Sequence, residues 1–215
     1  GGSNSLTLST GDNVANTDIS ASGAISGVTT LTLSDVGGTA TLSADVDVTT
    51  LTVGNTVANV AFTGNGSSVA NSFTSANDGT FIFGASGGTQ TYNAGLTTTS
   101  VGSTVTLNGT IATSDDAVVL GAVTLGSATT IDTNSTTTNR ADITVAAITG
   151  GNNTLTLTTE NNVTGSDVTA SGNITGVTTL TLASVGGTAT LSGDVDVTTL
   201  TVGNTVANVA FTGNG

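Results

Sequence analysis

The acidic side chains are the first candidates for chemistry in this chain. Asp45 and Asp47 stand two residues apart in one expected strand, and Asp194 and Asp196 repeat that arrangement. Because alternate residues of a strand point to the same face, each pair presents two carboxylates together. Such hard oxygen ligands could hold Ca²⁺, which takes about six to eight oxygens. Solvated surface charge is the competing interpretation, since it is the ordinary role of an exposed Asp.

The sequence around these acids argues against a known calcium motif and against a hydrolase. The solenoid calcium pattern G-G-x-G-x-D is absent, because residues 37–41 read GGTAT. Paired carboxylates also serve glycosidases. Solenoid enzymes that act on polysaccharides, however, line their clefts with basic, His or aromatic side chains. This chain has one basic residue, no His and 3% aromatics. We therefore expect no enzyme, and no cofactor other than Ca²⁺.

Composition excludes further classes of function. The 215 residues include no Cys, Met, Trp, Pro or His, and the net charge is −13. Cys nucleophiles, Cys/His zinc sites and P-loop lysines are therefore impossible. Fourteen acids against one basic residue exclude a nucleic-acid partner, and no apolar run approaches the ~20 residues of a membrane span. The 36% hydrophobic content, in short alternating stretches, favours a folded β protein over a disordered chain.

Threonines form the other chemical pattern. Stacked on one another, outward Thr-x-Thr pairs would form a flat hydroxyl array of the kind found in ice-binding solenoids. Thr is also a favoured residue on exposed strands, which explains the same pattern without a ligand. The series is interrupted at Asp142/Thr144, Ala122/Thr124 and Thr80/Ile82. The pairs are Thr30/Thr32, Thr50/Thr52, Thr104/Thr106, Thr154/Thr156, Thr179/Thr181 and Thr199/Thr201.

A long internal repeat organises the elements that must carry these side chains. Residues 1–66 recur at 150–215, a shift of 149, and 51 of the 66 positions are identical. We therefore interpret residues 1–149 as one complete solenoid repeat unit and residues 150–215 as the start of the next. A continuous solenoid has no true domain boundary between such units.

A shorter period lies inside the long one. The segment VTTLTL at 28–33 returns twenty residues later as VTTLTV at 48–53. Each unit of this length holds three short strands with alternating apolar residues. The pattern predicts an all-β protein, a parallel β-solenoid (β-helix) of ~20-residue rungs with three short strands each. About seven rungs per 149 residues, ~4.8 Å apart, would span ~35 Å. The pairs expected to stack are Leu31 on Leu51, Ala40 on Val60, and Leu42 on Phe62.

An antiparallel β-sandwich, with strands about every 8–12 residues, is the competing fold. Residues 67–149 fit either fold less clearly, since strand-like pieces recur there at irregular intervals. We expect longer gaps such as 64–79 to leave the solenoid as surface loops. Arg140, the only basic residue, could pair with Asp142.

The rhythm of the second copy resembles that of a known group of proteins. The runs TTLTL (178–182), GGTATL (186–191) and VDVTTLTVGN (195–204) are similar to the β-strand repeats of giant bacterial surface proteins. These include autotransporter-type and haemagglutinin-like adhesins. The resemblance implies an extracellular or cell-surface location and a role as stalk, fibre or matrix component. It assigns a role to no individual residue.

The sequence therefore leads to a structural hypothesis. We expect a subunit or segment of an extracellular tandem-repeat fibre, stalk or cell-surface matrix, whose partner is a further copy of itself stacked end to end. Unpaired strand edges at the two ends of a solenoid are the basis of this expectation. The alternatives are an adhesin shaft with sites in residues 67–100, an ice-binding solenoid, and a functional amyloid of short subunits that stack by strand addition.

Overall fold

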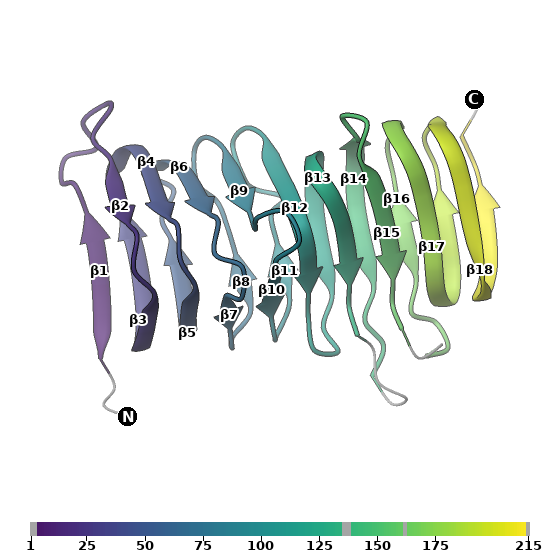
Figure 1. Cartoon of the computed structure of the whole chain (residues 1–215), viewed down its shortest axis with the longest axis horizontal. Helices are drawn as coiled ribbons and strands as arrows, with labels where there is room; N and C mark the ends of the chain where they lie inside the picture. Colours follow the sequence, from purple (N-terminus) through teal and green to yellow (C-terminus); the bar gives the residue numbers. More distant parts are fainter. Residues whose placement is uncertain (1–3, 135–138, 161–162, 214–215) are drawn as a thin grey trace.

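The chain folds into an elongated β-solenoid whose strands pair in parallel, and the predicted fold class is thereby confirmed (Figure 1). This computed structural model describes residues 4–134, 139–160 and 163–213, and these contain no helix. The strands follow one another along the long axis in chain order. They are β1 (Ser5–Ser9), β2 (Ile19–Ala21), β3 (Ile25–Ser34), β4 (Val36–Leu42), β5 (Val46–Val53), β6 (Val57–Phe62), β7 (Ser68–Val69), β8 (Phe73–Thr74), β9 (Phe81–Phe83), β10 (Thr89–Tyr92), β11 (Leu96–Thr97), β12 (Val105–Ala112), β13 (Val118–Asp132), β14 (Ile143–Thr149), β15 (Thr154–Thr158), β16 (Val168–Ala170), β17 (Ile174–Leu191) and β18 (Val195–Phe211).

Strand segments form three stacks along the solenoid, which we name A, B and C. Stack A contains β1, 30–34, 50–53, β8, β11, 118–120, 143–145, β16, 188–191 and 208–211. Stack B contains β2, 40–42, 60–62, β9, 105–107, 123–125, 148–149, 174–177 and 195–197. Stack C contains 25–28, 46–48, β7, β10, 109–112, 129–132, β15, 179–184 and 199–205. The chain visits them in the order A, B, C, so one circuit is one turn.

The register inside the first copy follows the twenty-residue period. Leu31 pairs with Leu51, Ala40 with Val60, and Leu42 with Phe62, as predicted. The apolar residues of β4 and β5 are buried and the threonines between them are half-buried or exposed, whereas the apolar residues of β1 and β2, in the first turn, are only half-buried. Stacking turns therefore joins the short apolar segments into one continuous core, which a single turn could not bury alone. Elsewhere the turns are less uniform, since paired residues are separated by 18 residues between β12 and β13 and by 26 between β13 and β15.

A glycine bulge recurs at the same place in both copies. Gly27 and Gly176 have φ of 70° and 66°, a conformation that glycine adopts without steric cost. The pairing register shifts across each of them, between Ile25 and Val28 and between Thr175 and Val177. Each glycine thus supplies the extra residue of a β-bulge inside its strand, β3 or β17.

The stretch 64–79 does not leave the solenoid, so its prediction as a surface loop was wrong. β7 and β8 lie within it and pair with β5, β10 and β11. The polar side chains of Ser67, Ser75 and Asn77 are buried and hydrogen-bonded: the Val46 N–H donates to Ser67 Oγ, and Ser75 Oγ donates to Asn77 Oδ1. These satisfied polar groups replace the apolar alternation that marks the other strands.

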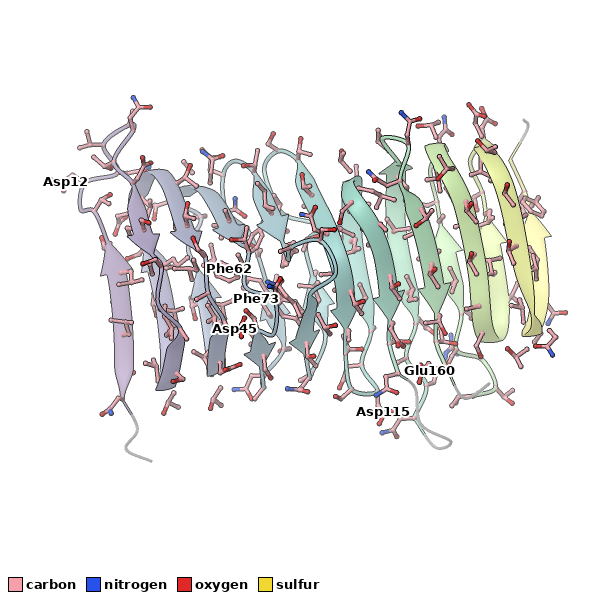
Figure 2. All side chains as sticks on the ribbon, viewed as in Figure 1. Asp12, Asp45, Phe62, Phe73, Asp115 and Glu160 are labelled. Atoms are coloured by element: carbon pink, nitrogen blue, oxygen red, sulfur yellow. The ribbon has the colours of Figure 1, made fainter. Side chains whose placement is uncertain are left out.

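An aromatic cluster fills the core of this stretch. Phe62 packs edge-on against Phe81 with ring centroids 5.3 Å apart, and Phe73 stacks on Tyr92 at 5.8 Å. Burial raises the pKa of Tyr92, whose hydroxyl donates to Gln90 Oε1. Figure 2 shows Phe62 and Phe73 in the interior, with Asp12, Asp115 and Glu160 on turns at the margins of the solenoid. Apart from Phe62, the rings of this cluster belong to residues 67–149, between the two copies.

The two copies occupy different stacks. Leu6 lies in stack A, but its equivalent Leu155 lies in stack C. From Leu6 to Leu155 the chain advances by twenty strand positions, counted along the three stacks. Since three positions make one turn, the advance is six and two-thirds turns. Each later pair of equivalents is displaced in the same way: Leu31 is in stack A and Leu180 in stack C. The 149-residue unit is thus not a whole number of turns, and its copies face different directions.

Candidate functional site

Several Asp and Asn side chains bond to the backbone of the following turn. Asp18 Oδ1 accepts the Thr39 N–H at 2.7 Å, and Asp167, the equivalent of Asp18, accepts the Thr188 N–H at 2.7 Å. Asp45 Oδ1 likewise accepts the Gly66 N–H at 2.8 Å. These carboxylates fix the register of successive turns, because each bond spans one circuit. Three more side-chain oxygens accept a backbone N–H of the next turn in the same way: Asn59 from Thr80, Asp142 from Asp167, and Asn173 from Asp194.

The four acids proposed as calcium ligands do not form one site. Asp45 is half-buried and bonded to backbone, whereas Asp47, Asp194 and Asp196 are exposed. The two pairs lie on different turns, far apart along the chain axis. Among the described residues, no three His, Cys, Asp or Glu side chains come together in a way that could hold a metal. Calcium binding stays a prediction.

Two shallow polar hollows occur at equivalent positions of the two copies. The larger, of about 380 Å³, is lined by Gly27, Val28, Thr29, Asp47, Val48, Thr49 and Ser68. The smaller, of about 80 Å³, is lined by Asn152, Gly176, Val177, Thr178, Asp196 and Thr198. Each offers one carboxylate beside hydroxyls in an open depression. Binding pockets usually enclose their ligands and are mostly apolar, so these hollows lack the features of a small-molecule site.

Arg140 forms the predicted pair with Asp142 and a further one. Its Nε and Nη2 donate to Asp142 Oδ1 and Oδ2, both at 3.1 Å, and Nη2 also donates to Asp167 Oδ2 at 3.1 Å. These hydrogen bonds and the nearby charges raise the pKa of Arg140. Since the guanidinium is exposed, the cluster tethers two adjacent turns at the surface rather than forming a buried ion pair.

The Thr-x-Thr pairs do not form a single array. Thr30/Thr32 and Thr50/Thr52 stack in register in stack A, where Ser5 and Thr7 precede them. Another ladder, in stack C, consists of Thr154/Thr156, Thr179/Thr181 and Thr199/Thr201. Thr104/Thr106 belongs to stack B, so the hydroxyls fall on three separate surfaces. The displacement of the second copy by two-thirds of a turn separates the ladders of stacks A and C, whereas Thr104/Thr106 lies outside both copies.

A pair of carboxylates went unnoticed in the sequence. Burial and the neighbouring Glu160 raise the pKa of Asp132 from 3.8 to about 6, and the hydrogen bond from the Asn134 N–H only partly opposes this. Asp132 lies opposite Thr158 in the pairing of β13 with β15. The 26-residue spacing of this turn differs from the repeat period, so no sequence pattern could bring Asp132 and Glu160 together.

Three of the large apolar side chains that are exposed among the described residues lie on β18. Leu200, Val202 and Phe211 are 36%, 47% and 57% exposed there. Their equivalents Leu51, Val53 and Phe62 are 4%, 5% and 2% exposed. A hollow of about 380 Å³ opens beside β18, lined by Gly193, Asp194, Val195, Val197, Leu200, Phe211 and Gly213.

The described residues thus form a parallel β-solenoid with exposed apolar side chains along β18. No protein-family model matches the chain, no curated protein is significantly similar to it, and no solved structure matches it. The described residues also contain no helix long and apolar enough to cross a membrane.

Proposed function

We propose that this chain is a structural segment of a tandem-repeat fibre, in which successive 149-residue units continue one solenoid end to end. The observation that carries the proposal is the unbroken ladder between the two copies. Thr129 and Ile131 of the first unit pair with Leu155 and Leu157 of the second. The join thus uses the same parallel pairing as the interior of each unit, so further units could follow without a new kind of contact.

The displacement of the copies gives this fibre a defined geometry. Six and two-thirds turns at ~4.8 Å advance the axis by ~32 Å per unit. Each unit is also rotated by two-thirds of a turn, in addition to the twist of the sheets. Equivalent surfaces then recur only after three units, or ~96 Å. The predicted ~35 Å per unit assumed about seven whole turns and is refined accordingly.

Chains that contain one, two and three complete units test the proposal. We expect their length, measured by small-angle X-ray scattering and electron microscopy, to increase by ~32 Å per unit at constant width. Compact particles, or particles that widen as units are added, would contradict it. A matched control has the same three units with Leu31, Leu51 and their equivalents replaced by Asp, which should abolish the rod.

The proposed location at the cell exterior rests on the resemblance of residues 178–204 to the repeats of bacterial surface proteins. Immunogold labelling of intact source cells tests it, because only an exterior fibre is reached by antibody without permeabilisation. Ice binding has weaker support than the structural role, since the Thr-x-Thr pairs are divided among three stacks.

A further inference from the structure

We propose that Asn65 is a site of spontaneous deamidation, and that the Asp45 carboxylate keeps it unreactive in the folded solenoid. The inference is independent of the proposed function, because it concerns the chemistry of two neighbouring turns. The reactants are the Asn65 carboxamide, the backbone nitrogen of Gly66 and a water molecule, so no other ligand or enzyme is required.

The reaction is an intramolecular acyl transfer followed by hydrolysis. The Gly66 nitrogen loses its proton to solvent and forms a bond to Asn65 Cγ. The Cγ–Nδ2 bond breaks, and the amide nitrogen takes up a proton and leaves as ammonia. Water then opens the cyclic imide at either of its carbonyls, which gives aspartate or isoaspartate. Glycine hinders this attack least among the residues that can follow Asn, because it has no side chain.

The described part of the chain contains two Asn-Gly pairs, and they differ in exposure. Asn65 and Gly66 are both exposed, whereas Asn108 is half-buried and Gly109 is buried. Asn108 Nδ2 also donates to the Phe83 carbonyl at 3.2 Å, which holds this carboxamide in place. Solvent therefore reaches the first pair more readily, and exposure alone would make Asn65 the more reactive of the two.

The Asp45 carboxylate engages the nucleophile of the exposed pair. Its Oδ1 accepts the Gly66 N–H at 2.8 Å, and a Cβ at Gly66 would lie 3.1 Å from its Oδ2. A hydrogen bond from the neutral amide and a nearby negative charge both disfavour loss of the amide proton. A hydrogen bond to a charged group is strong enough to make the free, deprotonated nitrogen about ten-fold rarer.

The product would disturb the pairing with the following turn. The Asn65 carbonyl accepts the Thr89 N–H at 2.7 Å, and a Cβ at Gly88 would lie 2.8 Å from Asn65 Cα. Isoaspartate lengthens the backbone at this residue by one methylene, for which such close packing leaves no room. The sequence of residues 45–66 recurs unchanged at 194–215, so both copies contain the same Asp and the same Asn-Gly pair.

The test follows deamidation at each Asn-Gly pair while the folded protein is kept in mildly alkaline buffer. Peptide mass mapping after pepsin digestion assigns the products to a residue, because the low pH of the digestion suppresses further reaction. We expect Asp45→Ala to deamidate at Asn65 about ten-fold faster than the unaltered protein does. Asn108, which does not contact Asp45, is the internal reference and should react at the same rate in both.

Asp18→Ala is the matched control. Asp18 makes the same kind of bond, to the Thr39 N–H, but no Asn-Gly pair lies beside it. This variant should leave the rate at Asn65 unchanged. Equal rates at Asn65 in Asp45→Ala and the unaltered protein would overturn the proposal, and so would an equal acceleration by Asp18→Ala.

Asp45→Asn decides the matter if Asp45→Ala opens the solenoid, which faster reaction at Asn108 would reveal. The Asn oxygen can still accept the Gly66 N–H but carries no charge, so we expect a rate at Asn65 between those of the other two proteins. A rate equal to that of the unaltered protein would show that the carboxylate does not protect Asn65. The proposal is also overturned if Asn65 reacts as fast in the unaltered folded protein as in guanidinium.

Discussion

The two copies of the repeat have nearly the same sequence and different surroundings. In the first copy, Leu51, Val53 and Phe62 are buried beneath β7, β8 and β9. In the second, the identical residues Leu200, Val202 and Phe211 form an exposed edge. Burial in this solenoid is therefore decided by the neighbouring turn and not by the residue's own segment, as expected for an architecture in which each turn contacts only the next.

The same comparison separates what is local from what is global. The glycine bulges at Gly27 and Gly176, and the bonds from Asp18 and Asp167 to the next turn, are preserved in both copies. The stack that each copy occupies is not preserved. The stack that the second copy occupies depends on how many strand positions residues 67–149 contribute between the two copies.

The largest expected contrast is between two identical phenylalanines. We expect Phe62→Ala to lower the free energy of unfolding by about 3–5 kcal/mol, because it removes a buried ring that contacts Phe81. Phe211→Ala should cost less than about 1 kcal/mol, since its ring is largely exposed. Guanidinium unfolding followed by far-UV circular dichroism measures both. Equal losses would show that β18 is covered in solution or that Phe62 is not packed as described.

A smaller contrast is expected between Asp18 and Asp167. Both accept a backbone N–H from the next turn, but Asp167 also accepts from Arg140. We expect Asp18→Ala to cost about 1 kcal/mol and Asp167→Ala up to about 2 kcal/mol, measured by urea unfolding. Arg140→Gln serves as the control: it removes the contact with Asp167 but not the backbone bond, so its loss should match the difference between the two Asp variants. A larger loss in Asp18→Ala than in Asp167→Ala would contradict this order.

The smallest effect concerns the contact between Asp132 and Glu160, which lies where the two units join. Glu160 corresponds to Gly11 in the first copy, so the contact with Asp132 exists only at the join. The raised pKa of Asp132, about 6 against 3.8, means that the folded state favours its protonated form. The free energy of unfolding of the protein with Asp132 therefore falls, relative to that of a variant with a neutral residue there, as the pH rises from about 4 through about 6.

Asp132→Asn tests this linkage. The Asn oxygen can still accept the Asn134 N–H, so the main change is the loss of charge. We expect the free energy of unfolding of Asp132→Asn to exceed that of the unaltered protein by about 1 kcal/mol at pH 8 and to equal it at pH 4. The expected gain is smaller than the full pKa shift would give, because water screens the half-buried carboxyl. Asp12→Asn, at an exposed turn of the first copy, should have no effect at either pH. An equal gain at both pH values would exclude the charge as its cause.

The part of the fold that repeats at constant spacing could be predicted from the sequence. The twenty-residue shift placed Leu31 on Leu51 correctly, because identical segments leave only one register in which every apolar residue points inward. The stretch 64–79 could not be recognised, since its strands are two residues long and its buried polar side chains resemble a loop. The displacement of the second copy was hidden for a related reason: turns of 18 to 26 residues in the middle cannot be counted without the pairing.

The repeat advances by six and two-thirds turns, which places Thr169 in stack A although its equivalent Ser20 lies in stack B. Cysteine pairs test this directly, because the chain has no cysteine of its own. Neighbouring positions of a stack lie ~4.8 Å apart, within the range that a disulfide spans. The outward positions of stack A to be paired in separate variants are Thr74 with Thr97, Thr97 with Val119, Val119 with Thr144, and Thr144 with Thr169. We expect all four pairs to form disulfides on mild oxidation of the folded protein. A chain in which Thr144→Cys fails to link to Thr169→Cys, while Thr149→Cys links to it instead, would contradict the claim.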